Sequence, residues 1–306
     1  MSHFTVLVIG DDYVGQLAPY DEELEVDPYR RYADTKDLEW YFRVYAEHNK
    51  DAEEPDLEAL ASFLTEHWGE EWLYEPQGGI YQMSTFNPVA KWDWYAVGGR
   101  WAGYFKLKKK AKGIAVKGEP GLMGASGEFD ADIVRKGDVD VEAMRGERGH
   151  QANKIWNRAQ AVFGDLPEMR SWEDVLGDYL DEKGDISDED LKFAREEYGG
   201  QLRVKAVNEH NERCRVEGRR DDEIGVWGEL ADFQAPLTEY VQEARDATLA
   251  TFAYVRDGEW YAPGKMGWFG MSDDTRAGKK RFWREFNEMF DALPDDTLLT
   301  LVDAHI

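Results

Sequence analysis

The most constraining feature of this sequence is a pair of apolar runs at its two ends. His3–Ile9 is rich in β-branched residues and stops at Gly10, and Thr297–His305 has a similar character. Runs of this length and composition are typical of buried strands. Because these are the two most apolar strand candidates, we expect both in the centre of one sheet. The fold class that follows is α+β, with a mixed central sheet that contains the N- and C-terminal strands.

The chain between these runs alternates between helical and extended patterns. A strand is predicted at 80–83, one bulged strand or two over 92–105, a basic hairpin tip at 106–117, and a hairpin at Asp257-Gly258. Segments 11–31 and 119–149 are expected to be irregular. Apolar residues at helical spacing predict helices over 36–48, after Pro55, over 152–163, 172–182 and 188–215, after Pro236 to Asp246, and over 279–291. The predicted caps are Thr35 for the helix over 36–48, Ser171 for 172–182 and Ser187 for 188–215.

These patterns suggest three parts of the chain. Residues 1–149 form a sheet-forming N-terminal part with an aromatic and basic motif, and residues 150–235 form a helical insertion. Residues 236–306 supply a hairpin, a helix and the C-terminal strand, which completes the N-terminal sheet. The role of the helical insertion stays open.

Charge is distributed unevenly along the chain. The sequence has 63 acidic and 37 basic residues, for a net charge of -26, yet Pro76–Gly118 contains one acid and eight bases. Acidic flanks repel polyanions, so duplex nucleic acid is disfavoured as a partner. A small anionic ligand in a focused pocket fits this distribution, and so does a role for the acidic surface itself. The simplest alternative is that the acidity serves solubility.

One segment concentrates the residues that bind nucleotides in other proteins. Tryptophan and tyrosine rings stack on bases, arginine holds phosphate through two parallel N–H groups, and paired glycines let backbone N–H groups approach an anion. The alternative is that the tryptophans share a core-facing side of a strand and that Arg100 pairs with Asp93. The candidate ligand-binding residues are Lys91, Trp92, Asp93, Trp94, Tyr95, Gly98, Gly99, Arg100 and Trp101.

Other chemistry is weakly supported by the sequence. The phosphate-loop, zinc-protease and serine-hydrolase motifs are absent from it, and we predict neither a cofactor nor a metal. Cys214 is the single cysteine, beside two arginines, and is interpreted as incidental. His3, Asp303 and His305 could converge if the end strands are neighbours, although strand-end packing is the default. Alternating aspartates from Asp130 to Asp140 are interpreted as a solvated loop rather than a cation site.

The N-terminus lacks a basic leader, and no apolar run approaches the length of a membrane span. We therefore expect a cytoplasmic protein without a membrane partner. A homo-oligomer is left open.

Several motifs are shared with a known group of proteins: His3–Gly10, Gln16–Tyr20, Asn87-Pro88, Lys91–Tyr95, Gly98–Trp101, Pro120–Leu122 and Leu301–Ile306. Together they resemble a family of bacteriophage-encoded proteins that are mostly of undefined activity. Where that resemblance predicts cysteine, this chain has Ala304, which argues against a terminal Cys–His metal site. The resemblance implies a phage accessory protein in the host cytoplasm, of the kind that counters host immunity.

Three functional hypotheses follow. The first is a non-enzymatic antagonist of host defence that binds a nucleotide-like ligand, such as a nucleotide second messenger, or a host defence protein. The second is an acidic DNA mimic that inhibits a host DNA-binding protein. The third is a nucleotide-processing enzyme, for which Asp93, Arg100, Asp303 and His305 would have to converge on one cleft.

Overall fold

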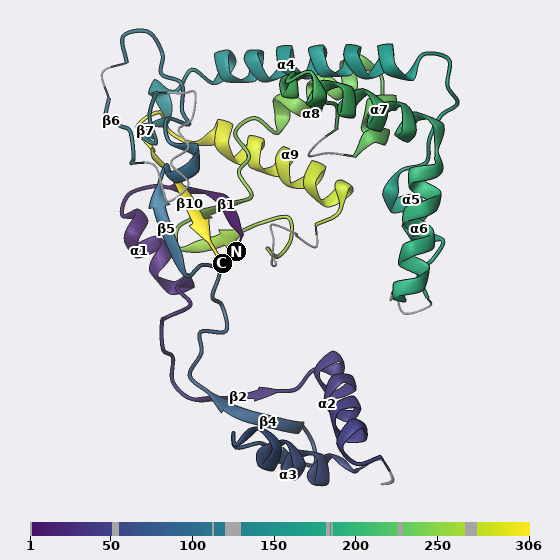
Figure 1. Ribbon diagram of the computed structural model, residues 1–306. Helices are drawn as coiled ribbons and strands as arrows, with labels where there is room; N and C mark the ends of the chain where they lie inside the picture. The colour runs from purple at the N-terminus through teal and green to yellow at the C-terminus, as the bar shows by residue number, and fades with distance from the viewer. Residues whose placement is uncertain are drawn as a thin grey trace. The chain divides into compact units, whose positions relative to one another are not determined.

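The computed structural model describes residues 2–50, 55–111, 113–119, 130–181, 184, 186–225, 229–266 and 274–306. The chain forms two compact units, shown in Figure 1. The first unit combines Met1–Tyr13 with Tyr95–Ala304, and the second combines Val14–Trp94 with His305 and Ile306. The boundaries between these units therefore lie at other positions than the boundaries between the three parts 1–149, 150–235 and 236–306.

The first unit is built on a sheet of seven strands among the described residues. The strand order is β6-β7-β10-β1-β8-β9, and β5 pairs with β10 beside this path. The N- and C-terminal strands are thus neighbours in the middle of a mixed sheet, as their apolar sequences predicted. The strands are β1 (His3–Ile9), β5 (Trp94–Val97), β6 (Ala115–Val116), β7 (Ile133–Arg135), β8 (Ala253–Arg256), β9 (Glu259–Tyr261) and β10 (Leu298–His305).

Strand pairing brings together segments that are far apart in the sequence. β1 runs parallel to β8, with Val6 opposite Ala253, whereas β10 runs antiparallel to β7. β8 and β9 form the predicted hairpin, whose turn residues Asp257 and Gly258 have φ angles of 54° and 78°. Two consecutive positive φ angles are what a tight two-residue hairpin turn requires, which explains the Asp-Gly pair.

Helix α9 (Arg276–Ala292) covers the core of this sheet. Its residues Phe282, Phe286 and Phe290 recur every fourth position and are all buried. They pack in one cluster with side chains of the central strands, including Leu7 and Leu301. Burying each of these phenylalanines contributes about 2 kcal/mol, so this contact anchors the helix to the sheet.

The remaining helices of the first unit form a second core. Ala159, Phe163, Val207 and Phe233 belong to this cluster. The elements that lie around it are α4 (Val141–Phe163), α5 (Trp172–Gly177), α6 (Asp188–Gly200), α7 (Leu202–Val216), η4 (Arg220–Asp222), η5 (Leu230–Gln234) and α8 (Leu237–Asp246). Two short turns, η2 (Gly99–Trp101) and η3 (Lys136–Asp138), belong to the sheet region.

The second unit has a small sheet and its own core. The strand order is β2-β4-β3, and both pairs are antiparallel. Tyr41, Leu60, Leu64 and Ile80 form the buried cluster between the sheet and two helices. The elements are α1 (Tyr13–Leu17), η1 (Ala18–Tyr20), β2 (Tyr29–Tyr32), α2 (Thr35–His48), α3 (Leu57–Trp68), β3 (Leu73–Glu75) and β4 (Gly79–Ser84).

Most predicted helices are present, and two of the three predicted caps are confirmed. The side chains of Ser171 and Ser187 accept hydrogen bonds from the N–H groups three residues on, as predicted. The cap of α2 is Asp34 rather than Thr35, because Asp34 and Asp37 form a reciprocal capping box.

Four predictions about local structure were wrong. Segment 11–31 contains α1 and β2, and the supposedly irregular 119–149 contains β7 and the start of α4, capped by Asp140. The stretch 188–215 is two helices, since Gly199-Gly200 is followed by Gln201 in an extended conformation. The stretch 92–105 has one short strand followed by the turn η2. Pro120-Gly121-Leu122 lies outside the described residues.

Candidate functional site

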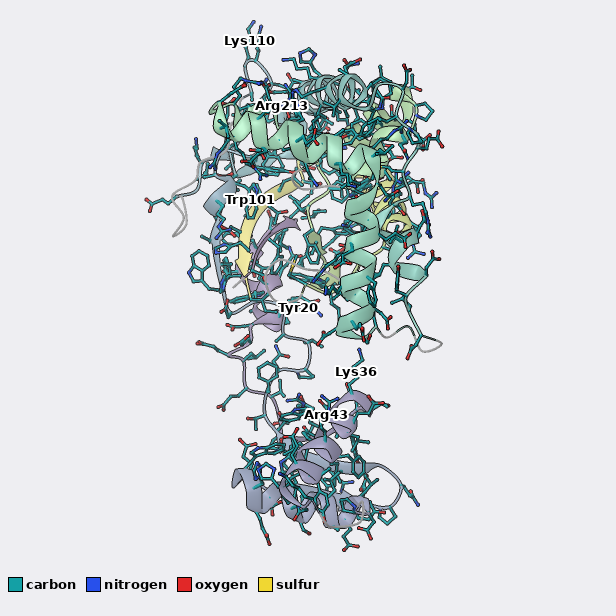
Figure 2. The ribbon with its side chains drawn as sticks, turned by 45° about the vertical axis from the view of Figure 1, so that its right-hand side comes forward. Tyr20, Lys36, Arg43, Trp101, Lys110 and Arg213 are labelled. Carbon is teal, nitrogen blue, oxygen red and sulfur yellow. The ribbon has the colours of Figure 1, made fainter. Side chains whose placement is uncertain are left out.

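The predicted aromatic and basic segment is divided between the two units. Lys91–Trp94 belongs to the second unit and Tyr95–Trp101 to the first. Tyr95 lies in β5, and Trp101 ends the turn η2 and packs against the sheet core; Figure 2 labels it. The two halves of the segment are therefore considered within their own units.

The paired glycines lie against two buried carboxylates. A side chain on Gly98 would place its Cβ 2.5 Å from Asp132 Oδ2, and one on Gly99 would place it 2.3 Å from Asp303 Cβ. Both glycines have positive φ angles, 71° and 50°. Close approach to carboxylates and a left-handed backbone together explain why glycine is needed at both positions.

Asp132 is a fully buried structural carboxylate. Its oxygens accept hydrogen bonds from the backbone N–H groups of Gly103, Tyr104 and Gly118 at 2.7 to 2.9 Å. These donors stabilise the negative charge without a cation. The interpretation of this aspartate as part of a solvated loop was therefore wrong, because the backbone folds around it.

Arg100 and Trp92 occupy different surroundings. The backbone N–H of Arg100 donates to Asp303 at 2.8 Å, while its buried side-chain Nε has no hydrogen-bond partner among the described residues. In the second unit, Trp92 is 8% exposed and its Nε1–H donates to the carbonyl of Leu17 at 3.2 Å. Its indole is thus held within the interior of that unit. Whether the predicted set binds a ligand stays a prediction.

Two histidine–aspartate contacts occur at the ends of the central strands. In the first unit His3 Nδ1 lies 2.8 Å from Asp303 Oδ1, and in the second His305 Nδ1 lies 2.7 Å from Asp93 Oδ1. Asp93 therefore pairs with His305 rather than with Arg100. Asp93 and His305 are two of the four residues named for the enzyme hypothesis, which stays a prediction. Among the described residues no group of three or more His, Cys, Asp or Glu side chains could hold a metal ion.

A larger candidate site lies in the helical part of the first unit. It is a cavity of about 870 Å³ among α4, η4, η5 and α8. This volume falls in the range of pockets that bind small molecules. Its described lining residues are Arg148, Gln151, Ala152, Lys154, Ile155, Arg158, Arg220, Asp221, Glu223, Gly225, Phe233, Tyr240 and Ala244.

Helix α4 supplies one wall of this cavity. Arg148, Ala152, Ile155 and Arg158 follow one another at steps of three or four residues, which places them along one face of the helix. Ala152 is small and buried against the neighbouring helices, whereas Arg148 and Lys154 are exposed to solvent. The wall therefore combines an apolar floor with a cationic rim.

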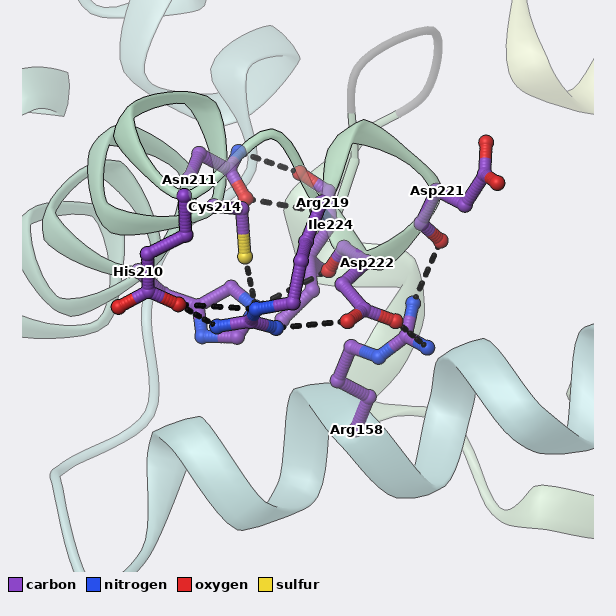
Figure 3. Close-up of polar contacts among 9 residues, drawn as sticks. Arg158, His210, Asn211, Cys214, Arg219, Asp221, Asp222 and Ile224 are labelled. Carbon is purple, nitrogen blue, oxygen red and sulfur yellow. Dashed lines mark hydrogen bonds and ion pairs between the residues drawn. The ribbon is translucent and has the colours of Figure 1, made fainter.

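Asp222 fixes the position of Arg158. Arg158 Nη2 lies 2.6 Å from Asp222 Oδ1, and its Nη1 donates to the Asp221 carbonyl at 3.0 Å (Figure 3). Arg219 binds the other oxygen of Asp222 at 2.6 Å. This hydrogen bond from Arg219, together with the charges of Arg158 and His210, lowers the pKa of Asp222 below its ordinary value. The carboxylate therefore stays charged and keeps Arg158 in place.

The loop that carries Arg220 is held to α7. The side chain of Asn211 bonds the backbone of Ile224 in both directions, at 2.8 and 2.9 Å (Figure 3). Cys214 is fully buried and its Sγ lies 3.4 Å from His210 Nε2, while that nitrogen lies 3.0 Å from the Asp222 carbonyl. These contacts give the single cysteine a packing role beside the cavity.

Two aromatic residues also line the cavity. The rings of Phe233 and Tyr240 are 5.1 Å apart and tilted by 37°. Burial raises the pKa of Tyr240 to about 12, so its hydroxyl is neutral over the physiological range. This wall offers a flat apolar surface without a negative charge.

The charges that line the cavity do not balance. Arg158 is paired with Asp222 and Glu223 with Arg215, at 2.6 and 2.8 Å. Arg148, Lys154 and Arg220 have no carboxylate partner among the described residues. Of the two lining carboxylates, Asp221 also has no cation partner among the described residues, so three unpaired cations stand against one unpaired carboxylate. In a chain of net charge -26, this local excess of positive charge favours an anion.

Sequence reasoning missed this cavity. Its residues come from two segments, 148–158 and 220–244, that are separated by more than 60 positions, and the sequence shows no motif that links them. The only available signal was the spacing of Arg148, Ile155 and Arg158 on one helix face, and 148–149 fell in a stretch expected to be irregular.

Comparison of the chain with protein-family models, with curated proteins and with solved structures gives no match. The resemblance to phage-encoded proteins therefore stays a prediction. Among the described residues no helix has the length and apolar character needed to cross a membrane.

Proposed function

We propose that this chain is a binding protein for a small anionic ligand that carries an aromatic ring, with a nucleotide as the best-fitting class. The observation that supports it is the cavity beside α4, which is lined both by three cations without a carboxylate partner and by the aromatic pair Phe233 and Tyr240. The proposal keeps the ligand class suggested by the sequence but moves the site from the segment around Arg100 to the helical part of the first unit.

Each wall would recognise one part of such a ligand. Arg148 and Arg220 would each hold phosphate oxygens through paired N–H groups, and Lys154 would add a mobile positive charge. Arg158, fixed by Asp222, would give a donor of constant orientation. The base would lie against Tyr240, where aromatic contact contributes about 1–3 kcal/mol.

The composition of the cavity favours binding over catalysis. None of the described residues that line it is Ser, Thr, Cys or His, the side chains that most often act as nucleophile or proton carrier. Its two carboxylates are Asp221 and Glu223, and Glu223 is already held by Arg215. We therefore place the protein in the class of ligand-sequestering proteins. In the phage context suggested by the resemblance, sequestering a nucleotide signal in the host cytoplasm would oppose host defence.

Calorimetric titration of the full chain tests the proposal. The panel contains nucleoside mono- and triphosphates, cyclic mono- and dinucleotides, and inorganic phosphate as the ligand without a ring. At least one nucleotide should bind, and more tightly than phosphate does. Arg148→Ala and Arg220→Ala should each weaken binding about tenfold or more, because each removes a charged hydrogen-bond donor.

Arg195→Ala is the matched control, since Arg195 is an exposed arginine on α6 outside the cavity. It should bind as the unmodified chain does. Absence of binding across the panel would overturn the proposal. Equal losses in Arg195→Ala and Arg148→Ala would show that the ligand follows general charge and not this cavity.

A further inference from the structure

An aromatic row lies on the helices of the second unit. Trp40 on α2 stacks on Trp68 on α3, with ring centroids 5.3 Å apart and planes within 10°. The row continues through His67, which contacts Trp68 at 5.6 Å and stacks on Phe63 at 5.3 Å. We call these four residues the Trp40 face.

The Trp40 face is open to solvent at its end. Trp40 is 50% exposed although one side of its ring is covered by Trp68. A large apolar ring held in one orientation and left half uncovered is typical of residues that anchor protein interfaces. The stacking on Trp68 orders the side chain before any partner arrives, which reduces the entropy lost on binding.

The second unit, which carries the Trp40 face, is strongly negative, and its charge is largely uncompensated. Between Val14 and Trp94 the sequence has 19 acidic and 6 basic residues. Among the described residues of this unit, Glu75 and Asp93 are the carboxylates that take part in an ion pair. Exposed carboxylates without a cation partner include Glu39, Glu66, Glu70 and Glu71.

We propose that the Trp40 face docks an arginine-rich segment of a partner protein. A guanidinium can lie flat on the open side of the Trp40 ring. The attraction between the cation and the ring is stronger once water has left the contact. The surrounding carboxylates raise the rate of encounter with a basic partner. The same field repels a second copy of this chain and repels nucleic acid, so charge selects the occupant.

Two cations near Trp40 allow an experiment to test whether the partner is positively or negatively charged. Lys36 and Arg43 lie four residues before and three residues after Trp40 on α2, and both are exposed (Figure 2). For a basic partner these side chains are unfavourable. For a polyanion they would be the favourable contacts beside a stacking ring.

The experiment measures binding of the full chain to a fluorescent arginine-rich peptide by anisotropy. The same measurement uses a glutamate-rich peptide and a single-stranded oligonucleotide. The arginine-rich peptide should bind, with an affinity that falls as salt rises. Trp40→Ala should weaken binding about tenfold or more, whereas the double variant Lys36→Glu/Arg43→Glu should strengthen it about threefold or more at low salt.

Two controls locate the effect. Phe193→Ala removes a similarly exposed ring from α6 in the first unit and should leave affinity unchanged. Arg195→Glu/Lys205→Glu alters the net charge by the same amount on α6 and α7 and should strengthen binding less than the α2 variant does. Because Lys36 and Arg43 are exposed, the double variant decides the question even if Trp40→Ala fails to fold.

The proposal is overturned if the Lys36→Glu/Arg43→Glu variant binds the peptide more weakly, or if the two charge variants behave alike. Preferential binding of the oligonucleotide that the Lys36→Glu/Arg43→Glu variant weakens would assign the face to nucleic acid. Concentration-dependent dimers lost in Trp40→Ala would assign it to a second copy. All three outcomes are independent of nucleotide binding in the first unit.

Discussion

The side chain of Asp303 occupies the space that a side chain on Gly99 would need. A Cβ built on Gly99 lies 2.3 Å from Asp303 Cβ and 2.4 Å from its Oδ2. The same carboxylate accepts the N–H of Arg100 and contacts His3, so the turn η2 is held against the central strand β10. The glycines of this segment are explained by packing, and their chemistry does not require a bound phosphate.

Gly99→Ala should destabilise the first unit by about 3 kcal/mol, from steric overlap with Asp303 and from a φ of 50° that alanine tolerates poorly. Urea unfolding measures this change. Gly218→Ala is the control, because Gly218 has a φ of 70° but nothing within 4 Å of the added methyl group. Its loss should be about 1 kcal/mol. Equal losses at both positions would remove the role given to Asp303.

Asp132→Asn should destabilise the protein by roughly 3 kcal/mol, because the new NH2 group would face backbone donors in a fully buried site. The carboxylate oxygens accept from Gly103, Tyr104 and Gly118. Asp130 is exposed, and Asp130→Asn should change stability little. Chemical denaturation of the two variants compares them directly. An Asp132→Asn variant as stable as Asp130→Asn would contradict the structural role given to the Asp132 carboxylate.

Asp222 should contribute stability that depends on pH in the acidic range. Hydrogen bonding to Arg219 lowers its pKa from the ordinary 3.8, so the native state binds the proton less tightly than the unfolded chain does. The stabilisation is therefore present above about pH 4 and is lost as the pH falls through the unfolded and then the native pKa. Unfolding curves of the unmodified chain and Asp222→Asn should differ at pH 7 and converge toward pH 3. A difference that stays constant with pH would refute this.

Phe286→Ala should be among the most destabilising single changes, with a loss of 3–5 kcal/mol from the cavity it creates, roughly the cost seen for buried aromatics. Phe286 is fully buried between α9 and the central sheet, in contact with Tyr254 and Phe290. Phe193→Ala, on the exposed face of α6, should cost little. Thermal unfolding of both variants tests the contrast.

The sequence by itself determined the central part of the fold. The runs that form β1 and β10 are strongly apolar. Their central position in the sheet could therefore be predicted without knowing which strands they pair with. The same holds for α9, whose phenylalanines recur every fourth residue, and for the Asp257-Gly258 turn, whose φ angles only a few residues accept. These are local signals, and each is read within one short window.

Only the tertiary structure decided what the polar residues do. Asp132 looks in the sequence like a member of an acidic, solvated segment, yet it is fully buried because distant backbone N–H groups and a glycine surround it. Asp303 lies in an apolar strand, and the contacts that surround its buried carboxylate come from the distant residues Gly99, Arg100 and His3. The cavity beside α4 likewise joins Arg148 to Arg220 and Tyr240 across the chain. A side chain's charge partners are set by long-range packing, and the energy of a buried charge depends on those partners; no local pattern contains that information.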